Sequence, residues 1–464
     1  MTELPRLNAS LLAQLENVGV PTYPRAELQT GMVHIGLGAF HRAHQAIYTE
    51  QVLNGGDLRW GTVGASLRTT NARDALATQD YLYTVCARDQ DGFELQIPGG
   101  LVNILADADA LIAAIADPQV RVVTLTITEK GYQDADRAGS AAGILALALT
   151  HRMESRAPLS ILSCDNLTGN GRILGESVLA LCAAPGLASW VRDQVAFPNS
   201  MVDRITPQTT AADRTWLNAV TGYTDASPVV CETFSQWVIE DDFRTDRPEW
   251  EAGGALVVKD VAPYERAKLR LLNLSHSLLA YLGLLKGYES IHEAVNDAEL
   301  RGFVLQTLDG EVMPHLEAPA GMDVNAYIAS ILRRFGNDAV PYRTAQVASD
   351  GSHKLPQRLF PTLKAAWAAG EPAPRLELAL CAWLQTLKGK AEDGTSIIYD
   401  DPGAEPVRDL LRTLEDPEAL VQAVARETTL WPAFPQDALL RMGKTFARLT
   451  NAGISAALTP LLTR

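Results

Sequence analysis

The hydrophobic residues follow different patterns in the two halves of the chain. In the first half, short runs of apolar and β-branched residues alternate with longer amphipathic or alanine- and leucine-rich segments. The runs cover residues 32–36, 61–67, 120–128 and 159–164, and the segments between them include 43–53 and 141–150. Continuous apolar strands separated by helices are typical of a parallel sheet covered on both faces. The first half is therefore predicted to be an open α/β domain.

The second half is predicted to be mostly helical. After Pro263, long segments with helical periodicity occupy residues 264–285, 323–335 and 376–388. Few β-branched runs remain beyond that proline. A change from strand-rich to helix-rich sequence indicates two domains, and the 464 residues leave room for two or three.

Two shorter β features complete the first half. Residues 81–87 and 93–97 flank the turn-rich sequence Asp89-Gln90-Asp91-Gly92, which predicts a local antiparallel hairpin. Strand-like pieces continue in residues 229–239 and 255–258. The boundary between the two domains is therefore expected between residues 260 and 290.

The first apolar run leads directly into a glycine turn. Residues 32–41 read MVHIGLGAFH, a strand that delivers Gly-x-Gly into the start of a helix. The first glycine allows the tight turn, the second lets the backbone approach a pyrophosphate, and the helix start supplies free amides. The third position of the dinucleotide fingerprint is a histidine instead of Gly or Ala, so a plain tight turn is the alternative. The expected cofactor contacts here are Gly36, Gly38, Ala39, Phe40 and His41.

The second strand ends without the acidic residue that usually binds the adenosine ribose. Arg68 stands there instead, and it could meet a 2′-phosphate or be an ordinary surface cation. We therefore expect NAD as cofactor and leave NADP open. The predicted fold class is α/β, with a Rossmann-like dinucleotide-binding domain over residues 1–275 and a mostly α-helical substrate-binding domain over residues 276–464.

Charge and composition exclude several classes of partner. The chain has 40 basic and 55 acidic residues, a formal net charge of −15, and no stripe of Lys and Arg that would suit nucleic acid. It has no apolar run long enough for a membrane span and no leader-like N-terminus, so a cytoplasmic location is expected. The five cysteines are widely spaced and the histidines form no zinc motif, so no metal is expected. The oligomeric state, monomer or dimer, is left open.

One apolar helical segment, residues 264–276, carries a polar stripe. At about 100° per residue, setting Lys268 at zero places Glu265 near ~60°, His276 near ~80° and Asn273 near ~140°. An apolar stripe that begins with Ala267 occupies the opposite side. Buried polar groups cost free energy unless they are paired or used, so this stripe is either a polar network between domains or a functional site.

As a functional site, the stripe suggests acid–base chemistry. Desolvation lowers the pKa of an amine, which makes Lys268 a candidate general base for a hydroxyl proton. Asn273 can donate an amide hydrogen bond to an alkoxide or carbonyl oxygen. Glu265 is assigned to proton relay or to positioning the lysine. The pair Tyr264 and Lys268 also forms Y-x-x-x-K, which leaves a tyrosine base as a second interpretation.

Six sequence blocks resemble the polyol-specific long-chain dehydrogenase family, also called the mannitol dehydrogenase family. They are GLGAFHRAHQ at 36–45, LTITEKGY at 125–132, SCDN at 163–166, FPNSMVDRITP at 197–207, CETFSQWVIED at 231–241 and KLRLLNLSH at 268–276. The resemblance implies a metal-independent, nicotinamide-dependent oxidoreductase in which an unaided lysine is the acid and base.

The resemblance assigns roles to individual residues. Lys268 matches the catalytic lysine, Asn273 and Asn166 the two amides that polarise the reacting C–O bond, and His276 the substrate-positioning histidine. Glu265 falls where the family has a glutamate associated with proton exchange. The further expected contacts are Glu129 and Asn166 for the cofactor and Asp203 for the substrate. Asn166 could instead cap the next helix, and Asp203 a turn.

Residues 342–358 bear on the substrate. This segment is more similar to fructuronate reductases than to mannitol dehydrogenases, and it holds three cations, Arg343, Lys354 and Arg358. Such cations suit the carboxylate of a linear sugar acid, although Arg343 and Arg358 could be ordinary surface charges. We expect D-mannonate and D-fructuronate, with mannitol and fructose or a related polyol as the alternative. A non-enzymatic nucleotide sensor is the alternative from another class of function. It predicts at least one damaged catalytic position, but Lys268, Asn273, Asn166 and His276 are all intact.

Overall fold

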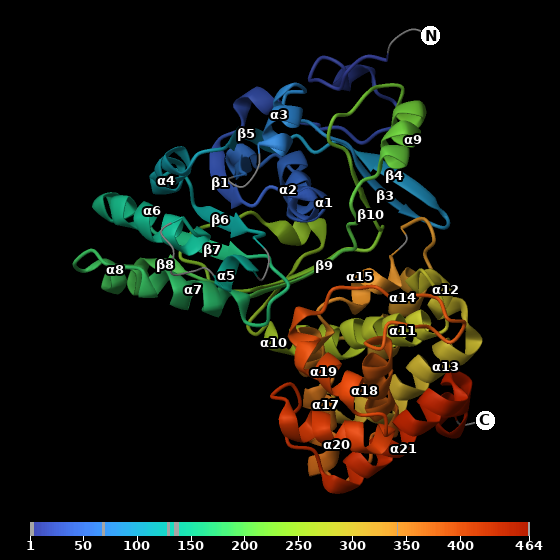
Figure 1. Ribbon diagram of the computed structural model, residues 1–464. Coiled ribbons are helices and arrows are strands. Elements are labelled where there is room, and N and C mark those ends of the chain that lie inside the picture. Colours follow the sequence, from blue (N-terminus) through green and yellow to red (C-terminus); the bar gives the residue numbers. More distant parts are fainter. Residues whose placement is uncertain (1–3, 67–69, 128–129, 134–138, 341, 463–464) are drawn as a thin grey trace. The chain divides into compact units, whose positions relative to one another are not determined.

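The computed structural model describes residues 4–66, 70–127, 130–133, 139–340 and 342–462 (Figure 1). The chain divides into two compact units, Met1–Ala262 and Pro263–Arg464. This division lies within the expected range of 260 to 290 but before the 275/276 boundary set from the sequence. It assigns residues 263–275, and with them Lys268, to the second unit.

The first unit is built on a six-stranded parallel sheet with the order β5-β2-β1-β6-β7-β8. The strands are β1 (Thr30–Ile35), β2 (Gly61–Ala65), β5 (Leu101–Leu105), β6 (Val122–Leu125), β7 (Leu159–Ser163) and β8 (Val195–Ala196). This order runs outward in both directions from β1 and β6, as in the doubly wound dinucleotide-binding fold. The predicted α/β class is confirmed. Doubly wound sheets bind ligands where the strand order reverses, so a ligand is expected at the carboxyl ends of β1 and β6.

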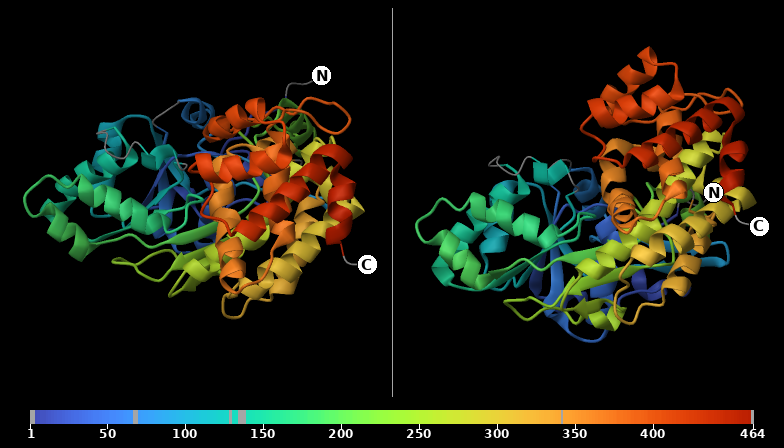
Figure 2. Two further views of the ribbon diagram at one scale, coloured as in Figure 1. Left: turned by 60° about the horizontal axis from the view of Figure 1, so that its bottom comes forward. Right: turned by 90° about the horizontal axis from the view of Figure 1, so that it is seen from below.

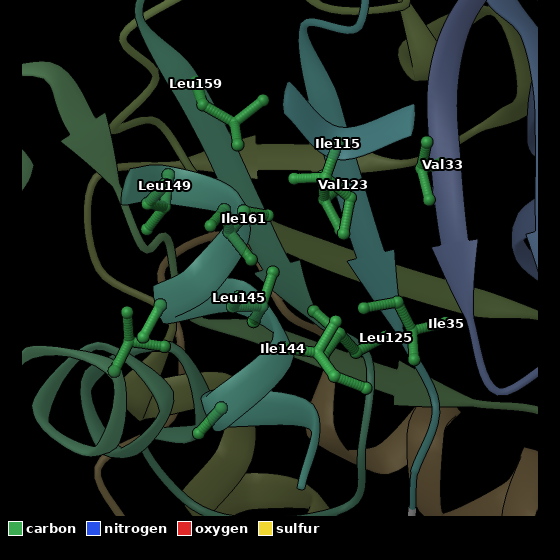
Figure 3. Close-up of a cluster of buried hydrophobic side chains, with 14 of the residues drawn as sticks. Val33, Ile35, Ile115, Val123, Leu125, Ile144, Leu145, Leu149, Leu159 and Ile161 are labelled. Carbon is green, nitrogen blue, oxygen red and sulfur yellow. The ribbon is translucent and has the colours of Figure 1, made fainter. Parts of the chain in front are cut away.

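Both faces of this sheet are buried, which explains its continuous apolar strands. Val33 and Val123 belong to a core cluster with α6, whereas their neighbours Met32 and Val122 point into a tryptophan-rich cluster on the opposite face. Figure 3 shows side chains of α6, among them Leu145, lying against β6 and β7. The helices of this unit are α1 (Ala39–Ala43), α2 (Gln45–Asn54), α3 (Asn71–Ala77), α4 (Ala108–Ala116), α5 (Lys130–Gln133), α6 (Ala141–Ser155), α7 (Asn170–Ala180), α8 (Leu187–Gln194) and α9 (Ala211–Thr221).

Two small sheets complete the first unit. The predicted hairpin is confirmed: β3 (Val85–Asp89) and β4 (Gly92–Gln96) pair antiparallel, and β10 (Val229–Cys231) extends them. The other sheet has the order β12-β11-β9, with β9 (Ser200–Asp203), β11 (Gln236–Glu240) and β12 (Leu256–Val258). The strand-like sequence before residue 260 therefore forms these two sheets and does not extend the parallel one.

The second unit consists of packed helices in the part of it that the structure describes (Figure 2). They are α10 (Ala262–Ala267), α11 (Leu274–Leu285), α12 (Ile291–Asn296), α13 (Ala298–Thr307), α14 (Val324–Phe335), α15 (Thr344–Ala348), α16 (Gly351–Arg358), α17 (Phe360–Ala368), α18 (Pro374–Thr386), α19 (Glu405–Thr413), α20 (Pro417–Glu427), α21 (Gln436–Ala452) and α22 (Ile454–Leu458). The three segments predicted to be helical are confirmed. Across the described ranges, we find no helix with both the length and the apolar character needed to span a membrane.

Candidate active site

The glycine turn lies at the carboxyl end of β1. Gly36 has a φ of +92°, and a Cβ there would collide with the carbonyl oxygen of Thr126, so a side chain is excluded on two grounds. Gly38 caps α1 in an extended conformation, and the atom nearest to a Cβ built on it is the Gly36 oxygen at 3.8 Å. The turn is thus closed on its inner side and open on its outer side, which leaves space for a ligand at the start of α1.

Two stacked histidines lie beneath the turn. The Thr126 hydroxyl donates to the Gly36 oxygen at 2.7 Å, so it accepts a hydrogen bond from His34 Nε2 at 2.9 Å. His34 Nδ1 must then accept from the Thr124 hydroxyl at 2.7 Å, which fixes the tautomer of a neutral ring. The ring of His41 stacks on that of His34 at 3.4 Å between centroids. Burial lowers the pKa of His34 to about 3 and that of His41 well below its usual value, so neither ring is charged at neutral pH.

These contacts explain the unusual third position of the fingerprint. His41 is 3% exposed and fills the space inside the turn by packing on His34, where a small residue usually stands. The first amides of a helix lack acceptors within it, and those of Ala39 and Phe40 begin α1 beside the open side of Gly38. The turn therefore fits a pyrophosphate. Of the three other expected cofactor contacts, Arg68 and Glu129 lie outside the described residues, and Asn166 lies in the loop after β7.

Asn166 and Asp203 belong to segments that a buried asparagine joins. Asn170, which is fully buried, donates its amide hydrogens to the carbonyl oxygens of Asp165 at 3.0 Å and Ser200 at 2.8 Å. Its Oδ1 accepts from the Ser200 amide at 2.9 Å. Asn170 thus links the loop after β7, which carries the exposed Asn166, to the strand that ends at Asp203. The N-cap of the following helix α7 is Gly169, not Asn166.

A tyrosine and a carboxylate join the ends of β6 and β7. Tyr132 donates its hydroxyl hydrogen to Asp165 Oδ2 at 2.8 Å and lies 2.5 Å from the Ser163 hydroxyl. The Ile127 amide donates to the same carboxylate oxygen at 3.2 Å. Sequence reasoning missed Tyr132, Asp165 and Asn170, although the first two lie within blocks quoted for the family resemblance. Their burial and pairing, which decide their role, require the fold to be known.

In the second unit, the polar stripe lies on a helix that contains a π turn. Residues Lys268–Asn273 form i→i+5 hydrogen bonds between α10 and α11, and we call this segment the π turn. It accommodates about one extra residue, which turns everything downstream back by about 100°. Asn273 therefore moves from ~140° to ~40° and His276 from ~80° to ~340° on the wheel set by Lys268. The wheel drawn from the sequence was wrong beyond Lys268, and the π turn brings these three residues closer to one face.

The residues of this stripe are held in a dry environment. Glu265, Lys268 and Asn273 are 7%, 8% and 5% exposed. Among the described residues, the Asn273 amide nitrogen is buried without a hydrogen-bond partner, which is costly unless a ligand supplies the acceptor. The ring of His276 stacks on Phe335 at 4.6 Å between centroids and meets the edge of Tyr342 at 5.2 Å. The apolar stripe opposite is fully packed at Ala267, Leu271, Leu274, Leu278, Leu282 and Leu285.

The three cations expected to bind substrate differ in their surroundings. Arg343 is exposed at the N-cap of α15. Lys354 is half-buried on α16, with Nζ 3.4 Å from the carbonyl oxygen of Val347. Arg358 follows one turn later on α16 and donates from Nη1 to the backbone oxygen of Asn273 at 3.2 Å. The structure therefore places Lys354 and Arg358 on one helix that contacts the π turn, and Arg343 on another.

The candidate residues fall into two sets, one in each unit. The first unit carries the glycine turn, Asn166 and Asp203, and the second carries Glu265, Lys268, Asn273, His276 and the three cations. Nowhere in the described part of the chain do three or more His, Cys, Asp or Glu residues gather in a group that could hold a metal ion. The chemistry available is that of an amine, amides, an imidazole and carboxylates, in a chain whose first unit has a dinucleotide-binding fold.

Two family models match most of the chain. The mannitol dehydrogenase Rossmann domain matches residues 30–252, and the mannitol dehydrogenase C-terminal domain matches residues 260–445. Each model falls within one of the two compact units, apart from the first residues of the second model.

Individual proteins are similar over most of their length. A mannitol 2-dehydrogenase of Phaeosphaeria nodorum is 37% identical over 90% of this chain and 79% of its own length. The D-mannonate oxidoreductase of Escherichia coli is 38% identical over 83% and 85%. Among solved structures, the Pseudomonas fluorescens mannitol 2-dehydrogenase in a ternary complex with NAD and D-mannitol has a TM-score of 0.87 at 38% identity, covering 98% of this chain and 99% of that one.

Proposed function

Because the chain belongs to the mannitol dehydrogenase family of oxidoreductases, we propose that it interconverts D-mannonate and D-fructuronate, with NAD as cofactor and without a metal. That it acts as an oxidoreductase on a polyol or a sugar acid follows from its relatives, whose match confirms the resemblance found in the sequence. The choice of a sugar acid goes further. It rests on Lys354, a half-buried cation on the helix that contacts the π turn, in a chain of net charge −15.

Mannitol and fructose are the second candidate pair. They are favoured by the similarity to a structure that contains NAD and D-mannitol. The D-mannonate oxidoreductase and the mannitol 2-dehydrogenases are about equally similar to this chain, so identity alone does not decide between a charged and a neutral substrate. A carboxylate distinguishes the two, and a cation that faces the carboxylate end of the substrate is the feature that would recognise it.

Lys268 and two asparagines are assigned to the chemical step. Bound NAD supplies a nicotinamide ring that accepts or donates the hydride. In the oxidation, the C–H bond of the alcohol breaks with its electron pair, and Lys268 removes the hydroxyl proton so that a ketone forms. The Asn273 amide, buried without a partner among the described residues, donates a hydrogen bond to the reacting oxygen. We assign Asn166 the second such hydrogen bond.

The remaining candidates hold the substrate and move the proton. His276 is fixed by its stacking on Phe335, so its imidazole can orient a substrate hydroxyl at a constant position. We assign Glu265 to relaying the proton away from Lys268 and Asp203 to binding substrate hydroxyl groups. Lys354 and Arg343 would bind the carboxylate. The glycine turn would bind the pyrophosphate of NAD through the open side of Gly38 and the amides of Ala39 and Phe40.

Replacing Lys354 with methionine should separate the two substrate classes. Methionine keeps most of the length of the side chain but removes the ammonium group. The loss of a charge-assisted hydrogen bond of about 1.5–3 kcal/mol corresponds to a KM for D-mannonate that rises about 10- to 100-fold. The KM for mannitol should change little, since mannitol has no carboxylate. The measurement is the initial rate of nicotinamide absorbance change against substrate concentration, for the sugar acid and for the polyol.

Lys364 offers a matched control, because it is exposed on the neighbouring helix α17. The Lys364→Met variant changes the net charge equally and should leave both KM values unchanged. If the unmodified enzyme oxidises only the neutral polyol, the sugar-acid assignment is wrong and mannitol becomes the substrate. A rise in KM that is equal for both substrates would remove Lys354 from carboxylate recognition.

A further inference from the structure

The π turn is contacted by an arginine from another helix. Arg358, at the end of α16, donates from Nη1 both to the backbone oxygen of Asn273 at 3.2 Å and to the hydroxyl of Ser277 at 2.9 Å. Asn273 ends the π turn, and Ser277 lies one turn further along α11. One guanidinium nitrogen therefore binds the helix just where its hydrogen-bonding changes from π to α.

The helix that presents Arg358 is itself held firmly at its other end. Asp401 is fully buried and accepts hydrogen bonds from the Ser352 amide at 3.0 Å, the Ser352 hydroxyl at 2.5 Å and Trp383 Nε1 at 3.1 Å. Its carboxylate lies at the N-terminus of α16, where negative charge is favourable. At Gly351, a Cβ would collide with the Tyr281 hydroxyl and Trp383 Nε1. The first turn of α16 is thus tightly packed, and these contacts fix the position of the helix that carries Arg358.

The register of the π turn decides where the catalytic groups lie. π turns are rare, occur mostly as single turns within α-helices and are frequent at functional sites. If the extra residue were lost or shifted along the helix, Asn273 would rotate by up to about 100° away from Lys268. A contact on the Asn273 carbonyl opposes such a shift, because it fixes the backbone of the very residue that has to stay in place.

We propose that Arg358 is a positioning residue, which holds the π turn in the register that places Asn273 beside Lys268, instead of the substrate contact expected from the sequence. The proposal rests on the proposed function only in taking Lys268 and Asn273 as the groups that act on the alcohol. It is independent of whether the alcohol is a sugar acid or a polyol. A positioning residue affects the chemical step for every substrate, whereas a carboxylate-binding arginine affects the binding of the charged one.

The experiment compares Arg358→Met and Ser277→Ala with the unmodified enzyme on D-mannonate and on mannitol. Arg358→Met should lower kcat about 10²-fold on every substrate that the enzyme turns over, since a misplacement of about 1 Å costs that much, with KM changing far less. Ser277→Ala removes one acceptor and leaves the charge of Arg358 intact, and it should lower kcat about 3- to 10-fold. With substrate deuterated at the reacting carbon, the isotope effect on kcat should rise in both variants, because hydride transfer becomes slower relative to product release.

Hydrogen exchange supplies a readout that does not depend on turnover. Amides of residues 268–277 should exchange faster in both variants. The control is Ser330→Ala on α14, because this serine donates only to the carbonyl of Tyr327 in its own helix, and it should change neither kcat nor exchange in 268–277. If Arg358→Met does not fold, Ser277→Ala decides by the same measurements.

Two outcomes would overturn the proposal. One is a KM that rises for the sugar acid alone with kcat retained, since this identifies Arg358 as a substrate contact. The other is unchanged kcat and unchanged exchange in Ser277→Ala. Should the enzyme turn over only mannitol, the sugar-acid assignment fails, but kcat on mannitol and the exchange of residues 268–277 still decide the role of Arg358.

Discussion

Replacing Lys268 with methionine should lower kcat about 10³-fold, within the range that general acid–base catalysis contributes, while the protein stays folded. Lys268 is 8% exposed on the π turn, so a side chain of similar length and apolar stem keeps the packing and removes only the amine. Without the amine, the hydroxyl proton has no acceptor as the hydride leaves. The rate of nicotinamide absorbance change measures the loss, and quenching of protein fluorescence by NADH checks that the cofactor still binds.

Two companion variants make this result specific to Lys268. Lys259 is exposed after β12, and Lys259→Met should keep full activity while changing the net charge equally. Tyr264→Phe tests the alternative in which the tyrosine of the Y-x-x-x-K pair is the base. Full activity of Lys268→Met, or a loss of activity in Tyr264→Phe as large as that in Lys268→Met, would show that the base is misassigned.

The elements of the fold were predictable because the strands are apolar on both faces. Val33 and Met32 are adjacent, yet each belongs to a buried cluster on its own side of the sheet, and such a strand reads as a continuous apolar run. The hairpin of β3 and β4 was equally clear, because turn residues separate two β-branched or aromatic segments. The candidate acid–base residues could be proposed from the sequence for a related reason. Polar side chains inside an apolar helix stand out against the helical period.

The geometry of the site was not predictable, since it depends on contacts between distant residues. Nothing in the spacing of residues 264–276 marks the extra residue of the π turn, so a regular wheel places Asn273 about 100° too far from Lys268. Asn170 and Asp401 are separated by 30 and 49 residues from the serines that they bind. A buried polar residue acquires its role from the group that it pairs with, and that partner is known only once the chain is folded.

A buried glutamate in the first unit should make folding stability depend on pH. Glu50, on α2, is 1% exposed and accepts hydrogen bonds from the Tyr23 hydroxyl and the Gly99 amide, both at 2.8 Å. Burial raises the pKa of Glu50 from 4.5 to about 7, more than these hydrogen bonds lower it. Through these hydrogen bonds, this carboxyl joins the segment before β1 to the segment before β5. Glu50 is not one of the candidate residues of the active site, and neither of its two partners is.

The gain in stability of Glu50→Gln over the unmodified protein should therefore be larger at pH 8 than at pH 4.5. As the pH rises from 4.5 to about 7, the unfolded chain releases the proton of Glu50 while the folded chain retains it, so the unmodified protein loses stability and then levels off. At about 1.4 kcal/mol per pKa unit, the free energy of unfolding falls by about 3 kcal/mol. The glutamine variant has no proton to release, so its stability does not fall in this way.

The measurement is urea unfolding of both proteins at the two pH values. The gain of Glu50→Gln over the unmodified protein should be larger by this amount at pH 8, and any effect of the amide that does not depend on pH cancels in the comparison. Glu154→Gln, a change at an exposed position on α6, should follow the unmodified protein at both values. If Glu50→Gln also follows the unmodified protein, the carboxyl of Glu50 is ionised in the folded state at pH 8 without cost, and burial does not control its proton.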